Sequence, residues 1–133
     1  MRFETGQEAS FAKTITEADI LLFAAVSGDT NPLHLDAVHA ARTRFGQRVA
    51  HGLLTGSLIS AVLGTKLPGP GSIFLSQSFK FLKPVHIGDT ITATVKVTSI
   101  RQDKPVITLA AACVNQRGES VLAGESVILF EEV

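Results

Sequence analysis

The sequence predicts an α+β fold in which an antiparallel β-sheet wraps around one long central helix. Residues Gly52–Thr65 are long enough for a helix and carry no charge on any face, so we expect this helix to be buried on all sides. Every segment after it has the composition of a β-strand. In a chain of 133 residues, we expect one domain spanning 1–133, in which only a curved sheet can surround such a helix.

The first part of the chain predicts a short strand and two helices. Ala9–Ile15 is the strand, and Thr16 is a candidate helix N-cap, since Asp19 follows three residues later and an apolar run comes next. We expect this helix to end near Gly28. A second, short helix is predicted over 37–45.

The second part of the chain predicts an antiparallel meander. Near-alternating and β-branched segments are separated by short turns that contain glycine, proline or aspartate. Sequential strands with short turns usually pair with their neighbours. An open sheet leaves edge strands exposed, and we expect a homodimer to cover them, with sites near the interface. The predicted strands are Ser72–Val85, Thr90–Arg101, Val106–Gln116 and Ser120–Glu131.

Composition narrows the function classes. The 12 basic and 12 acidic residues balance, and no basic block indicates a nucleic-acid partner. The single cysteine, Cys113, lies in an apolar run and excludes an intrachain disulfide, which favours a reducing compartment and a buried, inert thiol. No segment has the roughly 20 apolar residues of a membrane span, and the N-terminus lacks a signal-peptide core. We therefore expect a cytoplasmic protein with no membrane partner.

The segment Ser27–His34 is the strongest candidate for chemistry. It holds Asp29 and His34, two side chains that are readily tuned to move protons near neutral pH. Pro32 disfavours helical backbone at Asn31, so we expect both side chains to be held on a stiff loop. A plain turn with an incidental histidine is the alternative interpretation of the same residues.

The other histidines and the basic residues give weaker signals. His51 precedes the central helix; it is either a ligand or base, or, as we favour, a residue that positions the helix start. His39 and His86 are expected at the surface, and the spacing of these residues predicts no metal site. Four basic residues are candidates for phosphate contacts, with solvated surface charge as the favoured alternative: Lys66, Lys80, Lys83 and Arg101.

Three blocks in the sequence resemble the MaoC-like hydratases, the (R)-specific enoyl-CoA hydratase family, whose fold is the hot-dog fold. The first block shows no departure from the family pattern, and the resemblance extends from about Thr16 to Ile128. The blocks are Ser27–His34, Val49–Leu54 with Ser57–Ser60, and Leu67–Ile73 followed by Phe81–Val85 and Ile87–Asp89.

The resemblance implies reversible syn hydration of a trans-2-enoyl-CoA to a (3R)-3-hydroxyacyl-CoA. Asp29 and His34 would hold and deprotonate a water, while the backbone N–H of Gly52 would bind the thioester oxygen as an oxyanion hole. Asn31 would brace the loop or the water, and Ser60 would hydrogen-bond Asp29. No metal or redox cofactor is implied, and coenzyme A enters as part of the substrate.

Three alternatives stay open at this point. A 3-hydroxyacyl-[acyl-carrier-protein] dehydratase of fatty-acid synthesis would use the same site in the reverse direction. A hot-dog acyl-CoA thioesterase would carry a carboxylate on or beside the central helix, and Gly52–Thr65 has none. A non-catalytic acyl-binding module would not need Asp29, Asn31 and His34 together.

Overall fold

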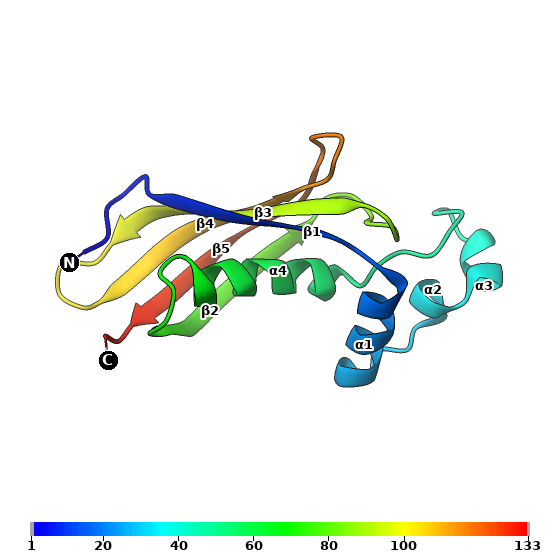
Figure 1. The fold of residues 1–133 in the computed structure, drawn as a ribbon, viewed down its shortest axis with the longest axis horizontal. Coiled ribbons are helices and arrows are strands. Elements are labelled where there is room, and N and C mark those ends of the chain that lie inside the picture. The colour runs from blue at the N-terminus through cyan, green and yellow to red at the C-terminus, as the bar shows by residue number, and fades with distance from the viewer. Residues whose placement is uncertain (1, 133) are drawn as a thin grey trace.

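The computed structural model describes residues 2–132, and in this part of the chain one five-stranded antiparallel sheet combines with four helices (Figure 1). The long helix α4 lies along one face of the sheet, and α1, α2 and α3 gather beyond one end of it (Figure 1). This is the predicted α+β, hot-dog arrangement. The elements are β1 (Glu8–Thr14), α1 (Glu17–Ser27), α2 (Pro32–Leu35), α3 (Ala37–Ala41), α4 (Gly52–Thr65), β2 (Ser72–Phe81), β3 (Thr90–Ile100), β4 (Val106–Val114) and β5 (Ser120–Phe130).

The strand order in the sheet is β1-β3-β4-β5-β2. The predicted meander is confirmed for β3, β4 and β5, which pair in succession. It is wrong for β2, which pairs with β5 and not with β3. The reason is that β1 occupies the other side of β3, in a register that runs from Glu8 opposite Lys96 to Thr14 opposite Thr90. Both β1 and β2 are therefore edge strands.

The core lies between α4 and the covered face of the sheet. Alternate residues of β3 point inward and are buried: Ile91, Ala93, Val95 and Val97. Cys113 on β4 belongs to the same cluster, and burial raises the pKa of its thiol to about 12. The expectation of a buried, inert cysteine is thus confirmed. The core residues that α4 contributes are Leu54, Leu58, Ile59, Val62 and Leu63.

One face of α4 is open in the single chain, so the expectation of burial on all sides is wrong. The side chain of Leu53 is 60% exposed, and Ser57, Ser60 and Gly64 are exposed at three- to four-residue spacing along the same helix. A single sheet covers the helix from one side only. The uncharged composition of α4 therefore indicates a further covering surface, which residues 2–132 do not supply.

Two glycines bring α4 close to the edge strand β2. A Cβ atom at Gly52 would lie 2.7 Å from Cε1 of Phe81, and one at Gly56 would lie 2.6 Å from Cε2 of Phe79. Real Cβ atoms do not approach carbon so closely, so each phenylalanine ring occupies the space that a side chain on α4 would need. The two rings are themselves neighbours, with centroids 6.0 Å apart. This packing fixes where α4 begins relative to the sheet.

Several element boundaries differ from the sequence expectations. The first helix is confirmed: Thr16 and Asp19 form a capping box, and Gly28 ends the helix at φ 79°. The second predicted helix stops at Ala41, four residues earlier than expected. β2 stops at Phe81 and not at Val85, since Pro84 shortly beyond cannot donate to a strand ladder. No helix within residues 2–132 is both long and apolar enough to cross a membrane.

We predict that Gly56→Ala lowers the free energy of unfolding by about 1–3 kcal/mol, because the added methyl group overpacks the contact with Phe79. Gly64→Ala on the same helix is the matched control, since a Cβ there would meet nothing within 4 Å. Alanine in a helix is about 0.5–1 kcal/mol more favourable than glycine, so this control should lose no stability. Urea unfolding measures both. An unchanged Gly56→Ala variant would show that α4 does not need this close approach.

Candidate active site

Asp29 lies directly after the glycine that ends α1. Gly28 is left-handed, and its N–H donates to the carbonyl oxygen of Ala24 at 2.9 Å. The next residue is held locally: the Asp29 amide donates to Oγ of Ser27 at 3.0 Å, and its Oδ1 accepts from the amide of Asn31 at 3.3 Å. These bonds fix the backbone while the Asp29 side chain stays 51% exposed.

His34 lies on a short helical turn, so the expectation of a loop is wrong for this residue. Pro32 is the first residue of α2, and the side chain of Asn31 caps the turn by accepting from the amide of Leu33 at 3.0 Å. Proline fits the first helical position, where an amide would have no partner. Asn31 thus braces the turn that carries His34.

The His34 ring has one nitrogen fixed and one free. Nδ1 lies 2.6 Å from the carbonyl oxygen of Val49, and because a carbonyl only accepts, Nδ1 carries the proton. The neutral ring then has a lone pair on Nε2, which lies 3.9 Å from Oδ2 of Asp29. That distance is too long for a direct hydrogen bond, and a water molecule can bond to both atoms. The His34 side chain is 12% exposed.

His51 lies at the centre of the site and is the N-cap residue of α4. Its Nε2 donates to the carbonyl oxygen of Asp29 at 2.9 Å, and its ring stacks on that of His34 with centroids 3.9 Å apart. The sequence favoured a role for His51 in positioning the start of the central helix, and in the structure His51 lies at the first turn of that helix. Gly52 follows as the first residue of α4, so its amide has no partner within the helix and lies at the positive end of the dipole.

The segment 48–51 forms hydrogen bonds with both Asp29 and His34. Arg48 donates from Nε to the carbonyl oxygen of His34 at 2.7 Å and pairs with Glu17 on α1 at 2.8 Å. Val49 and His51 supply the other two contacts described above. The sequence analysis missed Arg48, because a single arginine after Gly46 and Gln47 forms no motif that would indicate a contact with the site.

A second group of side chains, which includes His86 and Asp89, contacts the segment 48–51. Nδ1 of His86 donates to the carbonyl oxygen of Arg48 at 2.9 Å, so His86 is half-buried and the expectation of a surface residue is wrong. Its amide donates to Oδ2 of Asp89. Burial opposes ionisation of Asp89, but hydrogen bonds from Gln116 and His86, with the charge of Arg117, hold the pKa of its carboxyl below the usual value.

Ser60 makes no hydrogen bond to Asp29 within residues 2–132, where Oδ1 of Asp29 accepts from the amide of Asn31. Ser60 lies eight residues beyond Gly52 on α4, roughly 12 Å further along the helix axis at 1.5 Å per residue. A contact between Ser60 and Asp29 stays a prediction. Ser60 lines a groove of about 320 Å³ on the open face of α4, together with Leu53, Gly56, Ser57 and residues of β2.

Asp29, His34 and His51 each place a possible metal ligand atom within 4.8 Å of the others. One nitrogen of each ring is bonded to a carbonyl oxygen, which leaves the other ring nitrogens and the Asp29 carboxylate as the possible ligand atoms. The two rings are stacked with an interplanar angle of 28°. The absence of a metal stays a prediction from the sequence.

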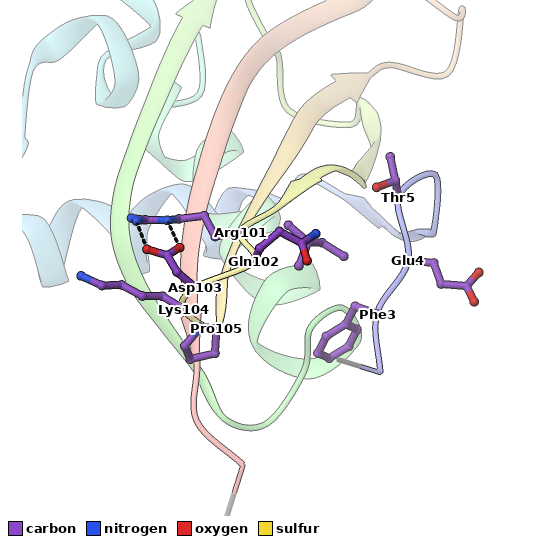
Figure 2. Close-up of a pocket in the computed structure, with 9 residues that line it drawn as sticks. Phe3, Glu4, Thr5, Arg101, Gln102, Asp103, Lys104 and Pro105 are labelled. Atoms are coloured by element: carbon purple, nitrogen blue, oxygen red, sulfur yellow. Dashed lines mark hydrogen bonds and ion pairs between the residues drawn. The ribbon is translucent and has the colours of Figure 1, made fainter.

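A larger hollow, of about 730 Å³, lies at the other end of the sheet, between the N-terminal segment and the β3–β4 turn (Figure 2). Arg101 on its rim pairs with Asp103 through two hydrogen bonds of 2.9 and 2.7 Å. Likewise, Lys83 pairs with Glu119 at 2.7 Å. These pairings favour the surface-charge interpretation of both basic residues.

Comparison with known proteins identifies the family of this chain. The family model described as "MaoC like domain" matches residues 2–115. The chain therefore belongs to the MaoC-like domain family.

Its similar relatives share most of their length with it. An (R)-specific enoyl-CoA hydratase of Rhodospirillum rubrum is 52% identical over 93% of this chain and 85% of the relative. An (R)-specific enoyl-CoA hydratase of Aeromonas caviae is 47% identical over 94% of this chain and 93% of the relative. The solved structure of an (R)-hydratase from A. caviae involved in PHA biosynthesis superposes with a TM-score of 0.95, at 45% identity and 98% coverage of both chains.

Proposed function

We propose that this protein is an (R)-specific enoyl-CoA hydratase, a hydro-lyase that adds water reversibly to trans-2-enoyl-CoA and gives (3R)-3-hydroxyacyl-CoA. The observation that carries the proposal is the pair Asp29 and His34, with a free Nε2 facing a carboxylate across 3.9 Å beside the N-terminus of α4. The (R) stereochemistry is supported by the two hydratase relatives at 52% and 47% identity.

The mechanism assigns each group a proton or a charge. A water held between Nε2 of His34 and Oδ2 of Asp29 attacks C3, and the pair takes its proton. Negative charge moves to the thioester oxygen, where the amide of Gly52 donates a hydrogen bond. The pair then returns one proton to C2 on the same face. The product has gained one H and one OH, and the site is restored. Asn31 holds the turn in place.

We further propose that residues 1–133 act as one domain, without a metal or redox cofactor, in the cytoplasm. Hydration adds H and OH across the C2–C3 double bond and leaves the overall oxidation level of the substrate unchanged, so it needs no redox partner. The continuous family match over 2–115 supports one domain, and the single, buried thiol of Cys113 suits a reducing compartment.

We predict that the purified protein hydrates crotonyl-CoA, seen as loss of the absorbance of the conjugated enoyl thioester. Release of free thiol with the enoyl absorbance intact would favour the thioesterase alternative instead. The same assay with crotonyl-acyl-carrier protein compares the two carriers, and a much higher kcat/KM on that thioester would favour the dehydratase of fatty-acid synthesis. Coupling the product to an R-specific dehydrogenase checks its configuration.

We predict that Asp29→Asn and His34→Ala each lower kcat by about a hundred- to ten-thousand-fold, because each removes one half of the proton-transfer pair. Circular dichroism and thermal melting confirm that the variants are folded. His39→Ala, an exposed histidine on α3, is the control and should keep wild-type turnover. A folded Asp29→Asn enzyme with near-normal kcat would refute the assignment of roles.

We also propose that the protein is a homodimer in which a second copy covers β2 and the open face of α4. The side chains of Phe74 and Leu75 on this edge strand are 45% and 53% exposed, and Leu53 on α4 continues the same apolar surface. An unpaired edge beside an apolar surface is a favourable place for a second copy to pair. The 98% coverage of the A. caviae structure supports the same fold, and thereby the same edge.

We predict that Leu75→Lys shifts the protein from dimer to monomer, because it places a charge in the covered apolar groove. Ala112→Lys is the matched control, since Ala112 is an exposed residue of β4 that faces away from α4. Analytical ultracentrifugation gives the mass of each. A monomeric wild-type protein, or a Leu75→Lys variant that stays dimeric, would contradict this arrangement.

A further inference from the structure

We propose that His51 is a positioning residue for the reaction: its ring fixes Asp29 and His34 relative to each other and to the amide of Gly52. This inference rests on the proposed function for its kinetic consequence. Its structural part rests on the contacts of the His51 ring alone.

The first contact is a hydrogen bond to the main chain of Asp29. Nε2 of His51 lies 2.9 Å from that carbonyl oxygen, and because the oxygen can only accept, Nε2 carries the proton. His51 is also the N-cap residue of α4. The bond therefore ties the start of the Asp29 segment to the start of the helix, and one side chain sets the distance between carboxylate and oxyanion amide.

The second contact is the stack on the ring of His34. The centroids are 3.9 Å apart and the planes differ by 28°. The ring of Phe23 also packs against His51, with centroids 4.8 Å apart and the planes tilted by 50°. With Nδ1 of His34 bonded to Val49, the stack holds the plane of the His34 ring. Its Nε2 then lies 3.9 Å from Oδ2 of Asp29.

The burial of His51 separates this role from a catalytic one. The residue is 1% exposed, and its Nε2 is already engaged. Its Nδ1 is buried without a hydrogen-bond partner among the described residues, and so is Oγ1 of Thr55, one turn further along α4. Unpartnered buried polar atoms destabilise a fold. A phenylalanine would fill much of this space without that cost, so we attribute the presence of a histidine to its Nε2–H, since the other ring nitrogen, Nδ1, is buried.

The test separates the hydrogen bond from the stack with three variants. His51→Gln keeps an N–H donor at a similar reach and loses the aromatic ring, His51→Phe keeps the ring and loses the donor, and His51→Ala loses both. Because misplacing reacting groups by about 1 Å can cost a hundredfold, we expect His51→Ala to lower kcat about 10- to 100-fold with KM close to wild type. The kcat values of His51→Gln and His51→Phe, which each keep one of the two contacts, should lie between those of His51→Ala and the wild type. The kcat of His39→Ala should equal that of the wild type.

The outcomes distinguish this inference from the proposed function. A folded His51→Ala enzyme with wild-type kcat, or one changed only in KM, overturns the positioning role and leaves the hydratase intact. If the wild type itself fails to hydrate crotonyl-CoA, the proposed function fails, and the ring contacts are judged by ¹⁵N–¹H correlation spectra of the imidazoles. Those spectra should show the proton on Nε2 of His51 and on Nδ1 of His34. The opposite tautomer at His51 overturns the inference, whether or not the variants fold.

Discussion

The close packing of α4 against β2 is the constraint on which the rest of the structure depends. Gly52 and Gly56 lack side chains, and the rings of Phe81 and Phe79 occupy that space. Because the first of these glycines is also the first residue of α4, the contact that sets the helix position sets the position of its free amide as well. The packing of α4 on the edge strand and the proposed stabilisation of the thioester oxygen therefore depend on the same contact.

In the candidate site, the side chains are positioned mainly by hydrogen bonds to main-chain carbonyl oxygens. The carbonyl of Val49 fixes the His34 ring, that of His34 receives Arg48, and that of Asp29 receives His51. Each bond satisfies a polar group that would otherwise be left unpaired in a partly buried turn. As a result, the backbone of the short segments 29–34 and 48–51 aligns the two side chains of the proposed proton-transfer pair.

Much of this could be predicted from the sequence, and the failures have physical causes. The capping box of α1, the pairing of β3 to β5 and the approach of Asp29 to His34 depend on local residue patterns, which the sequence displays directly. The placement of β2 depends on competition with β1 for one side of β3, and no local pattern reports that. Arg48 donates to the carbonyl oxygen of His34, 14 residues away in the sequence, and no local pattern reports such a contact either.

The Asp29–His34 pair is formed within one chain, on either side of the proline that begins α2. Neither member is borrowed from a second copy. In a mixed population in which one kind of subunit lacks the carboxylate and the other lacks the imidazole, no association of the two can rebuild an intact pair. Under the roles proposed for this pair, an active subunit has to carry both members on the same chain, and two such defective alleles in one cell cannot complement each other.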